Sequence, residues 1–325
     1  MEKVRKIISE IVEKQEINTV YFVGCGGSLS GFFPAKYFLS EETKKIKVGY
    51  MNANEFVHAT PKEIGKDTVV ITASQRGNTA ETVKATAVAN ELGAATVGLT
   101  FQVPSPLSDT AQYVIQYEFG PESVVENQKV SYGFKLALEI LNEEEGYEKY
   151  DEMVQALAKL NDIVVQAKKD IVPDAIKWAW EFKDDSVIYT MGSGACWGPA
   201  HQEAICIFME MQWINASVIH SGEFFHGPFE ITDKNTAFLM MKSCGHTRFL
   251  DDRALDFINK FNNRIFVLDA TQYGINELGE VAEYLEPMFY NNVIGVFNNL
   301  LADARKHPLT TRKYLAHGPI LKQLK

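Results

Sequence analysis

The sequence lacks several features that would assign its function at once. No apolar run of about 18 residues occurs among its 325 residues, so no membrane-spanning helix is expected. Its 32 Lys and Arg are outnumbered by 42 Asp and Glu, and a formal net charge of −10 argues against nucleic acid or an anionic membrane as a partner. The N-terminus has neither the apolar block nor the small-residue cleavage site of a secretory signal. We therefore expect a cytoplasmic protein that binds neither nucleic acid nor a membrane.

Signatures of metal and nucleotide binding are also missing. The four cysteines are scattered without a CxxC pair, which favours reduced thiols over a disulfide framework or a zinc site, and no histidine pair has the HExxH spacing. The glycine turn GCGGSLSG departs from the dinucleotide pattern G-x-G-x-x-G, because Leu29 stands where the third glycine belongs. No GxxxxGK[ST] loop is present. The sequence predicts a site without a metal, a nicotinamide or another cofactor.

Three matched segments indicate an internal duplication. A short β-rich run at 19–23 breaks into a glycine turn at Gly24, and the run at 187–191 does the same at Gly192, 168 residues later. The same offset relates Gly77 to Gly245 and Thr79 to Thr247, each pair following another apolar run. A third pair, ATVGLT at 95–100 and IFVLDA at 265–270, follows at nearly the same offset. Three matched strands argue for a duplicated α/β domain.

Helical segments are expected between these strands. They are predicted at 81–92, where Gly93 is typical of a helix end, from about 125 to 141, and from 148 to about 169. Strands alternating with helices indicate parallel sheets with helices on both faces, the flavodoxin-like three-layer αβα arrangement. Ligands bind such sheets at the carboxyl ends of the strands, where the glycine and hydroxyl turns would lie.

A candidate phosphate site follows one of the predicted strands. Hydroxyls at Ser74 and Thr79 precede a helix whose first N–H groups suit a phosphate dianion. Gly77 lets the backbone approach the phosphate closely, and the guanidinium of Arg76 can donate two parallel hydrogen bonds to it. The residues leave open a second interpretation, in which Ser74 and Thr79 only cap the helix.

A candidate acid–base pair lies in the second half of the chain. Glu210 stands in the strongly apolar helix IFMEMQW, where burial would raise its pKa into the range useful for proton transfer. Glu203, about two turns earlier, is expected on much the same face, as a partner of Glu210 or as a solvated residue. His226 lies in the loop SGEFFHGPFE, where an aromatic-flanked histidine is hard to explain as part of a core.

These motifs together resemble the sugar isomerase (SIS) family, as two tandem SIS domains. The matching segments are GCGGS, S-x-x-G-N-T, FFPAKYF at 32–38, ICIFMEMQWI at 205–214, SGEFFHGPFEI at 221–231 and HPLTTRKY at 307–314. The arrangement is similar to the isomerase half of glucosamine-6-phosphate synthase, and the details look closer to fructosamine 6-phosphate deglycases. The resemblance implies an N-terminal helix at 1–18, SIS domains at 19–147 and 178–306, linking helices at 148–177 and a tail at 307–325 that contributes to the active site.

The resemblance also implies roles for residues. It places the carbon-acid base on Glu210, the ring-opening histidine on His226 and an active-site lysine on Lys313. Phosphate-binding hydroxyls fall on Ser28, Ser74 and Thr79, with Arg76 in place of the synthase's middle serine. Further contacts with the substrate fall on the following residues: Gly26, Gly27, Gln75, Val125 and Asn127. Because the family histidine often reaches the site from a neighbouring subunit, a homodimer or higher homo-oligomer with the site at the subunit interface is implied.

The implied activity is hydrolysis of a 6-phosphorylated Amadori product, such as fructoselysine 6-phosphate, to glucose 6-phosphate and a free amine. Two alternatives share the fold: an aldose–ketose isomerase or amino-sugar phosphate deaminase with the same base, and a non-catalytic sugar-phosphate sensor. A sensor would have no need of Glu210 and His226, and it usually carries a DNA-binding module, of which the sequence has no sign. The residues do not indicate which amine is released.

Overall fold

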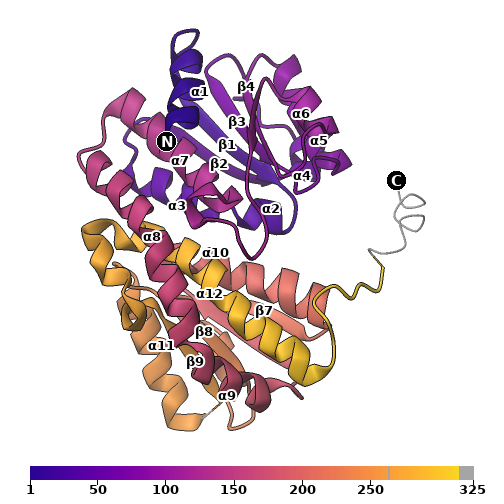
Figure 1. Cartoon of the computed structure of the whole chain (residues 1–325), viewed down its shortest axis with the longest axis vertical. Helices are drawn as coiled ribbons and strands as arrows, with labels where there is room; N and C mark the ends of the chain where they lie inside the picture. Colours follow the sequence, from indigo (N-terminus) through magenta and orange to yellow (C-terminus); the bar gives the residue numbers. More distant parts are fainter. Residues whose placement is uncertain (263, 315–325) are drawn as a thin grey trace. The chain divides into compact units, whose positions relative to one another are not determined.

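The computed structural model describes residues 1–262 and 264–314, which form two compact units. Unit 1 comprises Met1–Ile163 and Ile275–Met288, and unit 2 comprises Val164–Gly274 and the chain from Phe289 onward. The chain passes from one unit to the other within α8 (Tyr150–Asp170), between Gly274 and Ile275, and within α12 (Ala282–Arg305). Figure 1 labels the elements of both units.

Unit 1 is built around a parallel sheet. Its strands are β1 (Thr19–Gly24), β2 (Lys47–Asn52), β3 (Thr68–Ala73), β4 (Ala95–Thr100) and β5 (Tyr113–Gln116). Its helices and helical turns are α1 (Glu2–Val12), α2 (Gly27–Ser30), α3 (Phe33–Glu42), α4 (Ala53–His58), α5 (Ala80–Glu91), α6 (Pro106–Thr110), η1 (Val125–Asn127), α7 (Lys129–Glu145) and η6 (Ile275–Val281). The strand order is β2-β1-β3-β4-β5. The chain therefore reverses its direction of travel across the sheet between β1 and β3, which is the point where open α/β sheets bind ligands.

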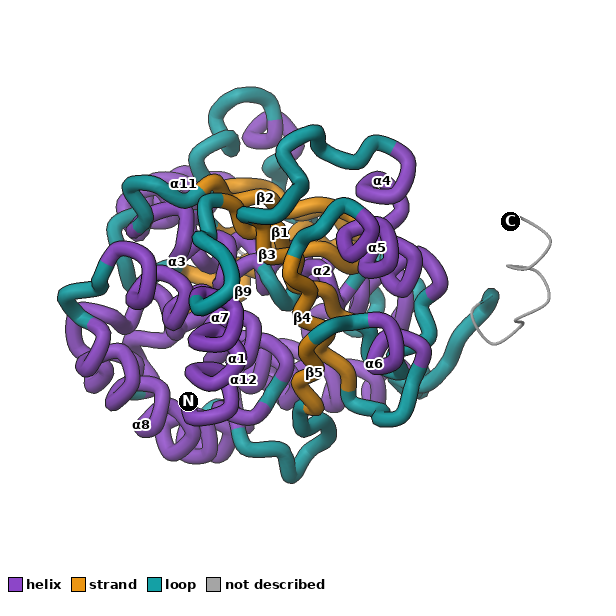
Figure 2. Tube along the Cα trace, turned by 90° about the horizontal axis from the view of Figure 1, so that it is seen from above, coloured by secondary structure: helices purple, strands orange, loops and turns teal. Residues whose placement is uncertain are grey.

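Helices cover both faces of this sheet (Figures 1 and 2). On one face Val23 and Val70 pack with Phe56 of α4 and with Ala85 and Ala89 of α5. On the other face α1, α3 and α7 lie together, and aromatic rings join strand to helix and helix to helix. The ring pairs are Phe22–Phe32 at 5.5 Å and Phe38–Phe134 at 4.8 Å between centroids. Because helices cover both faces, every residue of β3 and β4 is buried, instead of buried and exposed residues alternating.

Unit 2 repeats this plan with a second parallel sheet. Its strands are β6 (Val187–Gly192), β7 (Asn215–His220), β8 (Phe238–Lys242) and β9 (Ile265–Asp269). Its helices and helical turns are α9 (Val172–Phe182), η2 (Gly194–Cys196), α10 (Trp197–Gln202), the π-helix η3 (Glu203–Gln212), η4 (Pro228–Ile231), α11 (Arg248–Phe261) and η5 (Ala270–Tyr273). The order β7-β6-β8-β9 reproduces β2-β1-β3-β4 of unit 1. Register agrees as well, since Tyr21 pairs with Val70 and, 168 residues later, Tyr189 pairs with Phe238.

Alternate residues of the strands in unit 2 face different helices. Met191, Phe238 and Met240 pack against Ala254 and Ile258 of α11. The opposite face carries an aromatic cluster in which Trp178 of α9 packs against Phe266 of the sheet, and helices η3 and α12 contribute the other rings. The ring pairs that complete this cluster are Trp178–Phe208, Trp178–Phe297 and Phe266–Phe297.

The predicted fold class, parallel sheets flanked by helices, is confirmed, and the repeated strand order fits two related units. One predicted helix needs correction. The segment expected to be helical from about residue 125 begins as the short turn η1, and the regular helix α7 starts only at Lys129. Among the described residues, none of the helices combines the length and apolar character needed to cross a bilayer.

Candidate active site

The turn after β1 opens at the switch point of the sheet in unit 1. Gly24 lies opposite Ala73 in the register of β1 and β3, so the turns after these two strands leave the same sheet edge. Gly26 has φ +52°, a backbone conformation that favours glycine, and a Cβ placed there would meet no described atom within 4 Å. The backbone at Gly26 is therefore open to an approaching ligand. Ser28, in the short helix α2 that follows, is half-buried.

Ser74 and Thr79 come together after β3, as predicted. Their hydroxyl oxygens lie 2.8 Å apart, and the Thr79 N–H donates to Ser74 Oγ at 3.3 Å. Thr79 is the residue that precedes α5, but its hydroxyl is directed to Ser74 rather than to the first amides of the helix. The interpretation of Thr79 as a side-chain cap is thus wrong. The hydroxyl pair stands beside a helix start, where N–H groups favour an anion.

Gly77 shapes the turn between these two hydroxyls. It has φ +65°, and a Cβ at this position would lie 2.0 Å from Ser105 Oγ, so no other residue fits without displacing the neighbouring chain. The Leu107 N–H donates to the Gly77 carbonyl at 2.8 Å, which fixes the turn against α6. Arg76, next to Gly77, is exposed to solvent.

A cation that the sequence does not predict, Lys129, lies beside the first turn. Its Nζ donates to the Gly27 carbonyl at 2.6 Å, although the two residues are 102 positions apart in the chain. Gly31 makes room for this side chain, because a Cβ there would lie 2.9 Å from Lys129 Cε. A lysine at the first position of a helix opposes the helix dipole, which is itself a signal that the side chain serves another purpose.

The remaining predicted contacts of unit 1 are held in a hydrogen-bonded network. Gln75 Oε1 accepts from the Tyr117 hydroxyl at 2.7 Å, and burial raises the pKa of that phenol, which keeps it a donor. Asn127 Nδ2 donates to Glu118 Oε1 at 2.9 Å. Val125 is buried, and its carbonyl accepts from the Ser131 hydroxyl at 2.6 Å. Gln75 and Asn127 therefore have fixed orientations.

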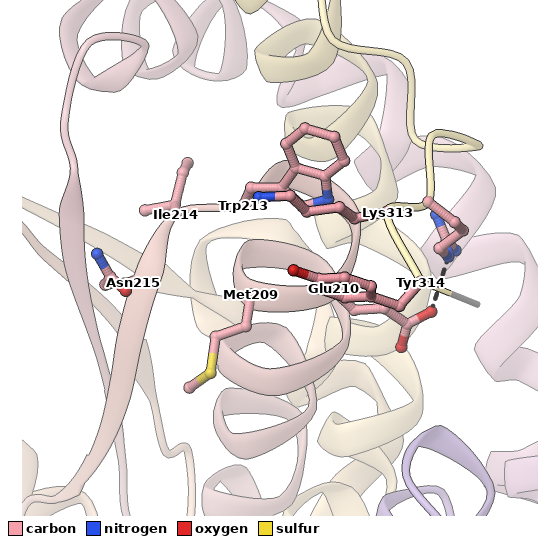
Figure 3. Close-up of a pocket in the computed structure, with 8 residues that line it drawn as sticks. Met209, Glu210, Trp213, Ile214, Asn215, Lys313 and Tyr314 are labelled. Atoms are coloured by element: carbon pink, nitrogen blue, oxygen red, sulfur yellow. Dashed lines mark hydrogen bonds and ion pairs between the residues drawn. The ribbon is translucent and has the colours of Figure 1, made fainter. Parts of the chain in front are cut away.

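Glu210 of unit 2 lines a pocket of about 380 Å³ (Figure 3). It stands on the π-helix η3, whose wider turn is rare and recurs at functional sites. Its side chain is 34% exposed, less buried than the surrounding apolar sequence predicts. The lining residues are Met209, Glu210, Trp213, Ile214, Asn215, Arg312, Lys313 and Tyr314. The segment 307–314 thus meets the helix that carries the predicted base, while residues 315–325 of the predicted tail lie outside the described residues.

Two cations from that segment stand in the Glu210 pocket. Arg312 Nε donates to Glu210 Oε1 at 3.0 Å, an ion pair that the sequence analysis did not anticipate; Figure 3 marks it with a dashed line. Lys313 Nζ lies 5.4 Å from the centre of the Trp213 ring, a cation–π contact. Lys313 therefore lines the same pocket as Glu210.

Glu203 begins the same π-helix but has a different environment. Glu203 is 2% exposed, so the expectation of a solvated residue is wrong. The expectation that Glu203 and Glu210 share a helix face was based on α-helical spacing, but residues 203–212 form a π-helix. Asn298 Nδ2 of α12 donates to Glu203 Oε2 at 3.2 Å. Burial raises the pKa of Glu203 to about 8, against which the single hydrogen bond from Asn298 acts only weakly. Glu203 is consequently a neutral acid at pH 7.

His226 is exposed on the loop between β7 and β8. The loop is anchored by the fully buried Phe224, and the guanidinium of Arg253 lies 4.1 Å from the centre of the Phe225 ring. The next residue, Gly227, has φ +133°, which a side chain would strain. His226 is not one of the described residues that line the Glu210 pocket.

Residues 1–262 and 264–314 bring together no group of three or more His, Cys, Asp or Glu side chains suited to a metal ion. The four cysteines, all among the described residues, form no disulfide bond.

Comparison with known proteins identifies the family. Residues 15–141 match the model of the SIS domain. The chain is 39% identical over 300 residues to fructosamine deglycase FrlB of Bacillus subtilis strain 168, covering 92% of both chains. The chain belongs to the SIS family. It is also 28% identical over 273 residues to fructoselysine 6-phosphate deglycase of Escherichia coli K12, which covers 82% of this chain and 77% of the relative.

Solved structures of SIS proteins share the fold over the whole length. A Salmonella typhimurium LT2 protein described as a phosphosugar isomerase is 52% identical, with a TM-score of 0.96 over 97% of this chain and 95% of that one. A Bacillus subtilis structure with the same description is 36% identical, with a TM-score of 0.92 over 98% and 99% of the two chains. The family predicted from the motifs is confirmed. The matched family model lies within unit 1, and unit 2 repeats its strand order.

Proposed function

We propose that the protein is a fructosamine 6-phosphate deglycase, which hydrolyses a 6-phosphorylated Amadori product to glucose 6-phosphate and a free amine. The observation that carries the proposal is the 39% identity to a fructosamine deglycase over 92% of both chains. The similarity to fructoselysine 6-phosphate deglycase supports a phosphorylated sugar as the substrate class.

The phosphate of the substrate binds the turns after β1 and β3. Ser28, Ser74 and Thr79 provide hydroxyls, and the Ser74–Thr79 contact of 2.8 Å supports a preformed pair. Gly26 and Gly27 present backbone N–H groups to the same anion, and Arg76 closes over it. Gln75, Val125 and Asn127 line the sugar. Holding the substrate by a group remote from the reacting carbons contributes orientation to catalysis.

Glu210 performs the proton transfer. It removes a proton from C1 of the open-chain ketose, the electrons form the C1=C2 bond, and the C2 carbonyl oxygen takes up a proton, which gives a 1,2-enaminol. The proton held by Glu210 returns to C2, the nitrogen lone pair forms the C1=N bond, and the proton on nitrogen is released, so the product is an imine of glucose 6-phosphate. Water adds to C1 and the amine leaves. Proton transfer by a positioned group typically contributes about 10²–10⁴-fold to the rate.

His226 opens the sugar ring by moving a proton between the ring oxygen and the anomeric hydroxyl. It acts from the neighbouring subunit, so the protein is a homodimer or larger homo-oligomer with its active sites at the interface. The exposure of His226 and its position next to Gly227 support this reach across an interface. Residues 19–147 and 178–306 form the tandem SIS domains, and Lys313 of the tail contacts the substrate.

Glu210→Gln tests the proposal. We expect kcat for fructoselysine 6-phosphate, measured as glucose 6-phosphate by coupling to glucose-6-phosphate dehydrogenase, to fall at least about 100-fold, because the amide cannot take the proton. The affinity for the substrate, measured by calorimetry, should change little. Glu91→Gln, at an exposed position at the end of α5, is the matched control. A variant that kept the wild-type kcat would exclude Glu210 as the base, and a wild-type protein inert toward every Amadori phosphate would exclude the function.

A further inference from the structure

Arg312 and Glu210 form an ion pair that the proposed reaction must rearrange. The guanidinium donates from Nε to Glu210 Oε1 at 3.0 Å and from Nη1 to the carbonyls of Leu309 and Thr311 at 2.7 and 2.9 Å. The last two bonds belong to its own turn of chain, so they aim the side chain at Glu210. Both partners are partly shielded from water, with side chains 20% and 34% exposed.

This ion pair is unfavourable for a base. A guanidinium in contact with a carboxylate occupies one of its two oxygens, so that oxygen cannot accept a proton from carbon while the pair is intact. The substrate must therefore draw Arg312 away from Glu210. Removing the guanidinium from its partner leaves a partly buried cation uncompensated, unless the substrate supplies an anion in exchange.

The pocket has the composition expected for such an anion. Of the eight residues that line it, Glu210 is the acidic one, whereas Arg312 and Lys313 both bring positive charge. Met209, Ile214 and the Trp213 ring form an apolar wall beside them. A carboxylate pairs with a guanidinium through two parallel hydrogen bonds, which a neutral amine substituent cannot do.

We propose that Arg312 exchanges Glu210 for the carboxylate of the amino-acid part of the substrate, with Lys313 as the second cation. This inference rests on the proposed deglycase function and assigns to Arg312 the selection of adducts that carry a carboxylate over adducts of simple amines. When the substrate carboxylate binds Arg312, Glu210 loses its ion pair in the same step. A substrate without the carboxylate therefore binds less tightly, and Glu210 stays paired with Arg312 when that substrate is bound.

Two matched pairs of substrates test the exchange. In each pair only the carboxylate differs: fructoselysine 6-phosphate against the 6-phosphate of fructose-cadaverine, and fructoseglycine 6-phosphate against that of fructose-methylamine. We expect the wild-type kcat/KM to favour the carboxylate member about 10-fold or more in at least one pair, since one charged bidentate contact separates its members. The pair that shows the preference tells whether the anion lies near the reacting nitrogen or at the end of a side chain.

Arg312→Gln should reduce this preference to less than about 3-fold, mainly by lowering kcat/KM for the carboxylate member. Lys260→Gln, which removes an exposed charge from the end of α11, should leave the preference unchanged. Equal kcat/KM within both pairs in the wild-type protein would overturn the inference, as would an Arg312→Gln variant that loses activity equally toward all four substrates. Glucose 6-phosphate from none of the four would instead overturn the deglycase function.

Discussion

Lys129 shows how a single side chain can prepare a phosphate site. Its ammonium group holds the Gly27 carbonyl, and this contact fixes the turn on which Gly26 and Ser28 stand. The charge also adds a positive potential near the hydroxyls proposed to bind the phosphate. Lys129 thus fixes the backbone conformation of the turn and makes its electrostatic potential more positive. It can affect substrate binding in both ways without touching the substrate.

Lys129→Met should therefore weaken substrate binding more than it slows chemistry. We expect KM to rise about 10-fold, since a hydrogen bond from a charged donor contributes about 1.5–3 kcal/mol, while kcat changes less than about 3-fold. Steady-state kinetics with the coupled assay measures both constants. Lys84→Met, at an exposed position on α5, is the control for loss of charge. A fall in kcat at unchanged KM would contradict the assignment to the phosphate turn.

At the scale of elements, the π-helix η3 places two carboxyl groups in unlike surroundings. Glu203 at its first residue is buried against Asn298 of α12, whereas Glu210 near its end opens into the pocket. In the contact between Glu203 and Asn298, two buried oxygens accept no hydrogen bond from the described residues: Glu203 Oε1 and Asn298 Oδ1. Protonation turns one oxygen of Glu203 into a hydrogen-bond donor and removes its charge, in agreement with its raised pKa. The neutral acid thereby joins η3 to α12.

The raised pKa makes the stability of the protein depend on pH. The pKa of Glu203 is about 8 in the folded protein and 4.5 in the unfolded chain, so between these values the folded state binds more protons. The free energy of unfolding therefore falls as the pH rises from about 5 to 8, by about 1 kcal/mol for each pH unit. Glu203→Gln, which keeps a donor for Asn298, should flatten this slope and be more stable than the wild type at pH 8.

Urea denaturation at pH 5, 6, 7 and 8 measures this dependence. Glu181→Gln, at an exposed position of α9, is the control and should keep the wild-type slope. The role of Glu203 as a buried neutral acid is refuted if the wild type and Glu203→Gln show parallel pH profiles.

Much of the fold could be read from the sequence, because the signals involved are local. The strands at 19–24 and 187–192 carry β-rich apolar runs ended by glycine, and the helix at 80–91 ends at a glycine two residues on. The π-helix could not be foreseen, since its apolar sequence fits an α-helix equally well. Lys129 and Arg312 were missed for a different reason: each meets its partner across 102 positions of sequence, and no local pattern records such a contact.

At the scale of the whole molecule, the duplicated fold has diverged at the two switch points. In unit 2 the turn equivalent to 74–79 is held by an acid of the chain itself: Asp251 Oδ2 accepts from the Ser243 N–H at 2.8 Å. Asp251 is fully buried, and burial raises its pKa. Ser243, whose N–H donates to Asp251, is the residue of unit 2 that corresponds to Gln75 of unit 1. This backbone N–H in unit 2 is therefore already paired within the chain, unlike the open turn proposed to bind phosphate in unit 1.

Sharing of active sites between subunits would be visible as complementation. Glu210→Gln and His226→Asn, each expressed alone, should be nearly inactive. Co-expressed with different affinity tags and purified through both, the mixed dimer should recover about half of the wild-type activity, because one of its two sites then combines an intact Glu210 with the partner subunit's intact His226. If both residues acted within one chain, each site of the mixed dimer would lack one of them and activity would not return. A tandem-purified mixed dimer as inactive as its parents would therefore place Glu210 and His226 of each site on the same chain.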